Sequence, residues 1–509
     1  MEVFRTGVNG GVNKDLAPQD LDANTYSSIH NLRMQDGRLI PVRGHEKLFS
    51  PLPASIGPSH AFGVVRAGVP VIYMGANNKI YKYASSTWAD VSRLVGGVYT
   101  TDAYWNHTVL NGCIFMNNGS DMPQVLEAGD NEFKDSANWP TTLRAKVMRP
   151  FKDYMFGFNL TNKPQGLIWS DPALSGTEPP SWDITDPTTQ AGEIILADTD
   201  GDIVEAQQLG DSLVIYKTDA VYVCRFIGGV YIFSFQKLFN NRGALNTHCV
   251  ATFDDKHFVI GYNDIYVHDG LQFQSVAEGR VKTYFYKDLD QDKLDKVFAY
   301  ANYTDKEVWV CYPNDAAVDG ACNKALVWNW VHNVWTTRDL PNCTYITNSS
   351  IETGIEDTWD GGENSTWDLG ANHWDSGSFS PAVLYPLMTS KLDEELYWAN
   401  DTALFDTEPI TYLLEKLSNH YQTPEVIKQI SYVTPDVEGT GLLTIRQGGQ
   451  FKLGEGISWK NPSQFPIGEY RVYLRGGARY LSFRYEGSTD ECIPAIRGAD
   501  IYVTMEGMK

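Results

Sequence analysis

The chain repeats one unit, a pair of short strands rich in β-branched and aromatic residues joined by a polar turn. The unit begins at positions 72, 114, 155, 214, 259 and 308, which are 42, 41, 59, 45 and 49 residues apart. A period of about 40–50 residues made only of strands is typical of propeller blades. The clearest pairs are 71–73 with 80–81, 214–216 with 221–223, 258–260 with 265–267, and 308–310 with 326–328.

The sequence therefore predicts an all-β fold, a β-propeller of six to eight blades. The alternative is a β-sandwich of unrelated hairpins, which would not produce such regular spacing. We expect an extended N-terminal arm in residues 1–55 and the propeller in 56–422. An insertion falls near 164–203 and an acidic Trp-Asp loop at 352–378. Residues 423–509 are expected to form a small antiparallel, sandwich-like β-domain. Short helices are predicted only at 288–298 and 411–419.

The net negative charge argues against a protein that binds nucleic acid tightly through its phosphates. The net charge is −22 from 41 basic and 63 acidic residues, and strong phosphate binding needs clustered Lys and Arg. Residues 164–216 hold ten acids and residues 339–390 hold eight, and neither stretch has a Lys or Arg. Such stretches keep proteins soluble, or they face and repel a polyanion. Both interpretations stay open on composition alone.

The seven cysteines are scattered and lack a C-x-x-C spacing, which favours free buried thiols made in a reducing compartment. The N-terminus lacks the apolar core of a signal peptide, and no apolar run reaches the ~20 residues of a membrane span. We therefore expect no membrane insertion by this chain.

Signatures of catalysis are missing from the sequence. It has no P-loop, no G-x-S-x-G and no H-E-x-x-H, and no His or Cys pair has metal-ligand spacing. The stretch 198–205 is a poor match to a calcium loop, so an acidic turn is the better interpretation. The Asp-box of sialidase propellers fails at Asp360, whose tryptophan comes seven residues later. We expect no enzyme activity, no cofactor and no metal.

Several motifs, taken in their order along the chain, resemble those of the tail nozzle proteins of short-tailed bacteriophages, also called stubby-tail or packaged-DNA-stabilisation proteins. The motifs are 10–16 (GGVNKDL), 31–39 (NLRMQDGRL), 42–44 (VRG), 168–172 (IWSDP), 179–183 (PPSWD), 197–201 (ADTDG), 257–270 (HFVIG to DIYVHDG), the Trp-Asp pairs at 359, 367 and 374, and 478–484 (ARYLSFR).

The resemblance implies a structural virion protein in the tail, made in the cytoplasm of the bacterial host. It implies a homo-hexameric ring below a portal–adaptor complex, with a fibre or needle as a further neighbour below. Double-stranded DNA would pass through the ring without specific binding, held in until ejection. The alternative function is a tail propeller that binds or cleaves host polysaccharide, since Trp and Tyr stack on sugars; strand packing explains the same aromatics.

A DNA channel works best when its wall does not bind the duplex, and acidic side chains repel phosphate. We therefore expect part of the two acidic stretches to line the channel or its rim. The candidate lumen-lining acids are Asp198, Asp200, Asp202, Glu356, Asp357, Asp360 and Glu363.

Overall fold

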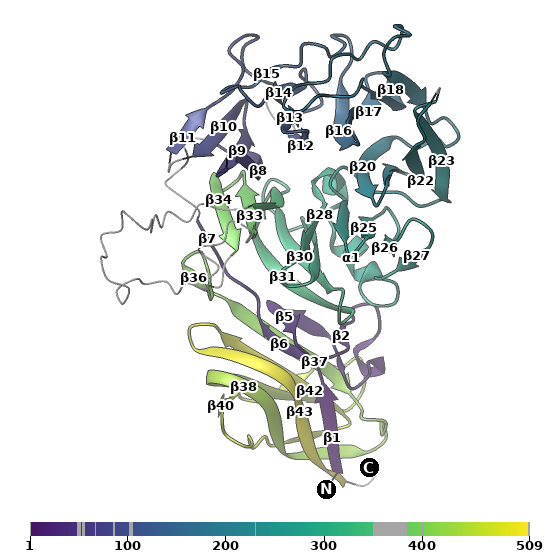
Figure 1. Ribbon diagram of the computed structural model, residues 1–509. Coiled ribbons are helices and arrows are strands. Elements are labelled where there is room, and N and C mark those ends of the chain that lie inside the picture. Colours follow the sequence, from purple (N-terminus) through teal and green to yellow (C-terminus); the bar gives the residue numbers. More distant parts are fainter. Residues whose placement is uncertain are drawn as a thin grey trace. The chain divides into compact units, whose positions relative to one another are not determined.

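The computed structural model describes residues 2–47, 52, 56–66, 68–84, 87–100, 105–229, 231–349, 384–399 and 402–506. Its topology is that of a β-propeller, as predicted (Figure 1). Six four-stranded antiparallel sections are each built from consecutive strands, β8–β11, β12–β15, β16–β19, β20–β23, β24–β27 and β28–β31. The strands β32, β33 and β34 form a further antiparallel section, and the blade number lies within the predicted range.

The internal contacts divide the chain into two compact units, described separately below. Unit 1 comprises Met1–Glu46, Ala251–Pro341 and Asp401–Lys509, and unit 2 comprises Lys47–Val250 and Asn342–Asn400.

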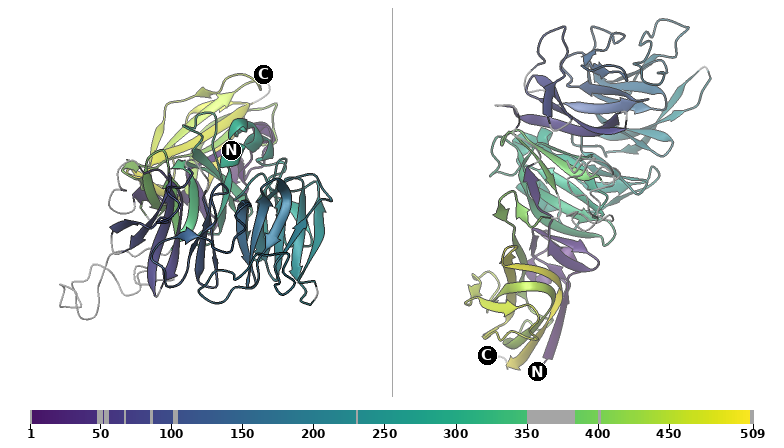
Figure 2. Two further views of the ribbon diagram at one scale, coloured as in Figure 1. Left: turned by 90° about the horizontal axis from the view of Figure 1, so that it is seen from above. Right: turned by 60° about the vertical axis from the view of Figure 1, so that its left-hand side comes forward.

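Unit 2 holds four of the consecutive blades, and Figure 2 shows them standing side by side in its left view, from dark blue to teal. Their strands are β8 (Pro58–Arg66), β9 (Val69–Ala76), β10 (Lys79–Ala84), β11 (Thr87–Asp90), β12 (Asn106–Leu110), β13 (Cys113–Asn117), β14 (Gln124–Leu126), β15 (Lys134–Asp135), β16 (Ala145–Phe151), β17 (Tyr154–Leu160), β18 (Lys163–Trp169), β19 (Gly192–Ile195), β20 (Ile203–Leu209), β21 (Ser212–Lys217), β22 (Ala220–Phe226) and β23 (Phe233–Asn240). The same unit contains β32 (Tyr345–Ser349), β33 (Tyr385–Ser390) and β34 (Glu395–Ala399).

The strand pairs recognised in the sequence are the middle strands of the blades. β9 pairs with β10, β21 with β22, β25 (Lys256–Ile260) with β26 (Ile265–His268), and β29 (Glu307–Tyr312) with β30 (Cys322–Asn329). The hairpin between β9 and β10 turns at Asn77, which has a positive φ of 49° that asparagine tolerates. The middle strands are buried on both faces, which explains their continuous apolar runs.

Neighbouring blades of unit 2 are joined by hydrophobic clusters. Trp105 fills the layer between the first two blades, and Gly75 faces its ring so closely that an added Cβ would come within 2.5 Å. The predicted insertion lies between β18 and β19. Its Trp182 is buried, and its ring meets Trp139 edge-on with centroids 4.6 Å apart. The insertion is therefore anchored by its own core residue.

The part of unit 1 that follows unit 2 along the chain continues the propeller pattern. Its elements are β25, β26, β27 (Phe273–Ser275), α1 (Lys282–Asp288), the 3-10 helix η2 (Gln291–Lys296), β28 (Phe298–Asn302), β29, β30 and β31 (Val334–Cys343), with β24 (Val250–Phe253) at the junction. The helix predicted at 288–298 is therefore two short turns, α1 ending at Asp288 and η2 following it.

The C-terminal strands of unit 1 pair antiparallel with one another, as predicted: the first two form a short hairpin of their own, and the other seven form one sheet. They are β35 (Leu404–Phe405), β36 (Glu408–Pro409), β37 (Thr411–Asn419), β38 (Ile427–Gln450), β39 (Ser458–Trp459), β40 (Ser463–Pro466), β41 (Gly476–Ala478), β42 (Tyr480–Ser488) and β43 (Cys492–Glu506). The stretches 427–433 and 442–446, in which apolar and polar residues alternate, belong to one 24-residue strand, β38. The segment 470–474 contributes only a bridge between Val472 and Val433.

The helix predicted at 411–419 is wrong, because this segment is β37. Leu, Glu and Lys favour a helix locally, but β37 pairs on one side with β42 and on the other with β4 (Ser28–His30). Alternate residues Tyr412, Leu414 and Lys416 are buried, so tertiary pairing overrides the local preference.

The N-terminal segment, predicted as an extended arm, consists of short strands, of which β1, β4 and β6 pair with later strands of unit 1. β1 lies antiparallel to β43, which the right view of Figure 2 shows as purple beside yellow. The strands are β1 (Glu2–Gly7), β2 (Gly11–Val12), β3 (Thr25–Tyr26), β4, β5 (Leu32–Gln35), β6 (Arg38–Pro41) and β7 (His45–Lys47), with a 3-10 turn at Pro18–Asp20.

All seven cysteines are free and buried, as the sequence predicted. In the part of the chain that the structure covers, no helix is long and apolar enough to cross a membrane.

Candidate functional site

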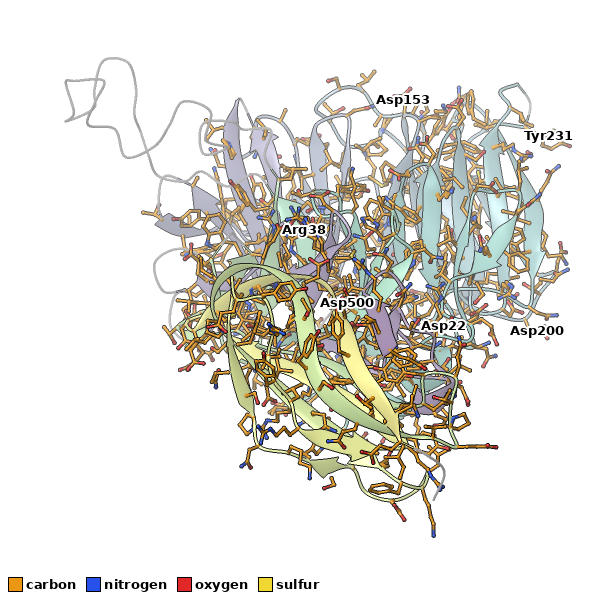
Figure 3. All side chains as sticks on the ribbon, turned by 90° about the horizontal axis from the view of Figure 1, so that it is seen from below. Asp22, Arg38, Asp153, Asp200, Tyr231 and Asp500 are labelled. Carbon is orange, nitrogen blue, oxygen red and sulfur yellow. The ribbon has the colours of Figure 1, made fainter. Side chains whose placement is uncertain are left out.

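The first three candidate acids share one loop of unit 2, residues 196–202 between β19 and β20, which we call the acidic loop. Asp198, Asp200 and Asp202 all point into solvent, and Figure 3 labels Asp200 at the margin of the side-chain view. Leu196 and Ile203, at the two ends of the loop, are buried and hold it to the blade. The structure thus brings these three carboxylates together on one exposed turn.

Lys217, at the end of β21, supports the acidic loop from below. Its side chain is fully buried, and Nζ donates to the backbone oxygens of Leu196 (2.9 Å) and Thr199 (2.6 Å) and to Thr199 Oγ1 (2.7 Å). Burial lowers the pKa of this ammonium, and nearby carboxylates, Asp219 foremost, oppose the shift. The lysine stiffens the turn and offsets only one of the surrounding negative charges.

Replacing Lys217 by methionine is expected to lower the free energy of unfolding by about 1–3 kcal/mol, because three buried acceptors lose their donor. The measurement is the midpoint of urea unfolding. Lys237→Met is the control, since Lys237 is exposed on the neighbouring β23 and should change stability little. Equal midpoints for the two variants would contradict the supporting role of Lys217.

The other four candidate acids, Glu356, Asp357, Asp360 and Glu363, lie outside the described residues, as does the Trp-Asp loop that contains them. That these acids line the channel or its rim therefore stays a prediction.

A second polar group in unit 2, which we call the histidine cluster, comes from the first strands of successive blades. His60 lies on β8, His107 on β12 and Tyr345 on β32, and His248 precedes β24. His60 Nε2 and His107 Nδ1 are 2.7 Å apart, and the His60 ring lies 4.4 Å from that of Tyr345 and 5.9 Å from that of His248. First strands therefore meet through side chains that are far apart in sequence.

A buried ion pair completes the histidine cluster. Arg149 on β16 donates through Nη2 to Glu205 Oε2 on β20, at 2.8 Å, and the Glu205 side chain is fully buried. Glu205 also accepts from the backbone N–H of Ala206 (2.8 Å) and His248 (3.0 Å). Each oxygen of this carboxylate thus has a partner, as a buried charge requires.

The imidazoles of the histidine cluster are held neutral. Burial first, and then the nearby Arg149, lowers the pKa of His107 to about 3. The same two causes contribute to the pKa values of His60 and His248, which also lie well below the ordinary 6.5. The cluster consists of buried, neutral rings packed around one ion pair. Such rings are suited to packing between blades and not to proton transfer at neutral pH.

The histidine cluster was not predicted, because its residues are not at the short spacings typical of ligand sets. The blade period itself is the available signal, since positions 60, 107, 149, 205 and 248 follow one another at 47, 42, 56 and 43 residues. Each of them is a polar residue on, or just before, the first strand of its blade.

In unit 1, two arginines converge on one carboxylate, a group we call the Asp305 clasp. Arg33 Nη1 lies 2.6 Å from Asp305 Oδ1, and Arg43 Nε lies 3.1 Å from Oδ2. Asn302 Nδ2 donates to Oδ2 at 2.9 Å. The side chains of Arg33 and Asp305 are only 8% and 6% exposed, so this is a buried network. It joins the N-terminal segment to the β28–β29 hairpin.

A second buried group lies beside the clasp on the same sheet. Trp309 Nε1 donates to Glu307 Oε2 at 3.0 Å, and the Arg338 guanidinium stacks 4.1 Å above the Trp309 ring. Burial raises the pKa of Glu307 to about 7, with Asp305 adding to the shift. Arg338 also donates to the Arg43 backbone oxygen at 3.3 Å.

The glycine-rich segment near the N-terminus is fastened to α1. Asp15 accepts from the backbone N–H of Thr283 (3.1 Å) and Tyr284 (2.9 Å), and Asn13 Nδ2 donates to the Gly279 oxygen at 2.8 Å. Gly11 has a φ of 66°, and a Cβ there would come within 2.9 Å of the Trp335 backbone nitrogen. The motif 10–16 therefore needs its glycine for close packing.

Within the described ranges, no group of three His, Cys, Asp or Glu side chains could hold a metal ion. The prediction of no metal and no enzyme activity stays a prediction.

Comparison with known proteins yields no family model that matches the chain, and no curated protein matches it. Solved structures do resemble it. YCF48 bound to a D1 peptide is 10% identical with a TM-score of 0.37, covering 73% of this chain and 97% of that one. A chain of the mitotic checkpoint complex is 12% identical with a TM-score of 0.37, covering 70% and 98%. Both likenesses concern the propeller fold alone.

Proposed function

We propose that this chain is a structural protein of a short-tailed bacteriophage tail, a nozzle subunit. Six copies form a ring below the portal–adaptor complex, retain the packaged genome and let the DNA pass on infection. The proposal rests on the resemblance in the sequence.

The observation that carries the proposal is what the resembling motifs do in the fold. Arg33 of the motif 31–39 and Arg43 of the motif 42–44 close on the same buried carboxylate, Asp305. The motif 10–16 holds α1 through Asn13 and Asp15. These three motifs near the N-terminus thus pack against segments of unit 1 that lie about 240 residues or more further along the chain, which supports a shared structural role for them.

The burial of four tryptophans counts against these particular rings as a carbohydrate-binding surface. Trp105, Trp139, Trp309 and Trp335 are fully buried, so these rings pack the core and are not platforms for sugars.

The test of the function is cryo-electron microscopy of the phage particle, or of the protein mixed with its portal–adaptor complex. A six-fold ring whose bore admits a duplex about 20 Å wide would support the proposal. A peripheral monomer with a solvent-open aromatic cleft would contradict it and favour polysaccharide binding, which depletion of host polysaccharide by the purified protein would then confirm.

Reversing the charge of the acidic loop is expected to hinder DNA passage. In particles carrying Asp198→Lys, Asp200→Lys and Asp202→Lys, ejection should slow at low salt and recover as salt rises, because new phosphate contacts are screened. The measurement is the rate of DNA release at two salt concentrations. The neutral triple variant with asparagine is the matched control and should lie between wild type and the lysine variant. Unchanged release in the lysine variant would exclude this loop from the channel.

A further inference from the structure

One exposed face of the C-terminal sheet of unit 1 carries tyrosines. Small or charged polar residues are more usual on such a face. The core side of this sheet holds Val433, Val472, Ile501 and Val503. The residues next to them in the sequence point to the other side. The outward residues form what we call the tyrosine–arginine face, which consists of Tyr432, Tyr470, Arg471, Tyr473 and Tyr502.

The rings of this face touch one another. Tyr432 stacks on Tyr502 with centroids 4.3 Å apart, and the Tyr473 ring lies 6.1 Å from that of Tyr432. Tyr470 and Tyr473 are 68% and 64% exposed. Figure 3 labels Asp500, two residues before Tyr502 on β43. The face is therefore continuous and open to solvent within this unit.

Arg471 sits among these rings without a carboxylate. Its Cζ lies 5.2, 5.4 and 5.8 Å from the ring centres of Tyr432, Tyr473 and Tyr470. Across the residues that the structure describes, Arg471 has no ion pair and no hydrogen bond. Tyrosine and arginine are the residue types enriched at the centres of protein interfaces, where an unpaired guanidinium can take up a partner's carboxylate.

The charge of the surroundings permits an acidic partner. From Thr423 to Lys509 the chain has ten Lys or Arg and ten Asp or Glu residues, although the whole chain carries −22. This part of the chain is thus neutral in a strongly acidic protein, and a second copy of the chain is itself an acidic partner.

The insertion between β18 and β19 in unit 2 has the complementary features. Leu174 and Ile184 are 74% and 48% exposed. Asp183 and Asp186 flank Ile184, and hydrogen bonds from Thr185 and Thr188 lower the pKa values of these two carboxyls, which keeps them ionised. Trp182 anchors the loop in the core, so little ordering is needed when it binds.

We propose that the tyrosine–arginine face binds the β18–β19 loop of a second copy of this chain, with Ile184 against the tyrosines and Asp183 or Asp186 at Arg471. Two different surfaces meet in such a contact, so it is heterologous and can close into a ring. This inference extends the proposed nozzle function. The contact itself does not depend on that function, but a ring of six copies does.

Self-association of the full-length protein tests this contact. Sedimentation at protein concentrations up to about 100 μM should show assembly for the wild type, and Arg471→Asp or Tyr473→Ser should weaken it at least tenfold. Combining Arg471→Asp with Asp183→Arg and Asp186→Arg should restore assembly, because the charges are exchanged between the two surfaces. Arg225→Asp and Tyr231→Ser are the controls, since both residues are exposed on unit 2 outside this contact.

A cysteine pair provides a second measurement. All seven native cysteines are buried, so in an oxidised mixture of Tyr473→Cys and Ile184→Cys proteins the new thiols should dominate cross-linking. We expect the mixed dimer. A wild type that stays monomeric and gives no mixed dimer overturns the inference, as does assembly that Arg471→Asp leaves intact. If the protein assembles through this contact but is absent from phage particles, the nozzle function is wrong and the contact stands.

Discussion

Replacing Asp305 by alanine is expected to lower the free energy of unfolding by about 3–5 kcal/mol. The carboxylate neutralises Arg33 and Arg43 together, at 2.6 and 3.1 Å, and Arg33 is almost completely buried. Removing one partner of a buried pair leaves an uncompensated charge, which costs far more than the pair contributes in a surface setting. The midpoint of urea unfolding, followed by tryptophan fluorescence, measures the effect.

The matched control is Asp90→Ala, which breaks an exposed ion pair of similar length. Lys79 Nζ lies 2.6 Å from Asp90 Oδ2, and both side chains are 41% exposed. We expect a loss of about 0–1 kcal/mol there. If Asp305→Ala costs no more than Asp90→Ala, the clasp does not hold the N-terminal segment. The same result would remove the structural support for the nozzle signature.

Acid is expected to destabilise the protein strongly between pH 6.5 and 4. The folded-state pKa values of His45, His107 and His268 are lowered to about 3, and those of His60 and His248 also lie well below 6.5, chiefly because of burial. As the pH falls below 6.5, these histidines therefore bind protons in the unfolded chain but stay neutral in the folded chain. Each such histidine lowers stability by up to about 1.4 kcal/mol per pH unit as the pH falls.

One carboxyl group opposes this trend. The pKa of Glu307 is raised to about 7, so between pH 7 and 4.5 the folded state binds its proton more readily than the unfolded state. Falling pH thus relieves the cost of burying this group. The contribution of this one carboxyl group is smaller than that of the five histidines. The free energy of unfolding is therefore still expected to fall as the pH falls.

The pH dependence of the urea midpoint, measured at pH 7, 6, 5 and 4, checks this expectation. A His60→Gln, His107→Gln double variant should show a shallower slope, because it removes two of the five imidazoles with lowered pKa values. His248, Tyr345, Arg149 and Glu205, which also face these rings, stay in place. His332→Gln removes an exposed histidine and should leave the slope as in the wild type. A wild type equally stable at pH 7 and pH 4.5 would contradict the neutral, buried state of the histidine cluster.

Most middle strands of the blades were predictable because they are buried on both faces and so carry a local apolar run, as in 214–216 and 221–223. The edge strands β11, β15 and β19 were not found, since β15 has two residues and β19 has four, with little apolar pattern. The segment 411–419 shows the opposite error, where local helix preference outweighed pairing partners that lie far away in the chain.

For the candidate site, the sequence marked the acidic loop through its charge, which is a local property. It could not show Lys217 beneath that loop, because an isolated lysine on a strand looks like any surface lysine until burial and its three acceptors are known. The four acids from 356 to 363 stay predictions, as they lie outside the described residues.

The sequence by itself determined the repeat of paired strands, the free buried thiols and the excess of negative charge, because each depends on residue types at short spacing. Only the tertiary structure decided that His60, His107 and His248 meet, that Arg33 and Arg43 share Asp305, and that Arg471 lies among tyrosines without a carboxylate. These contacts join residues tens to hundreds of positions apart. No local pattern encodes them, since they arise from how blades and strands pack once the backbone pairing is complete.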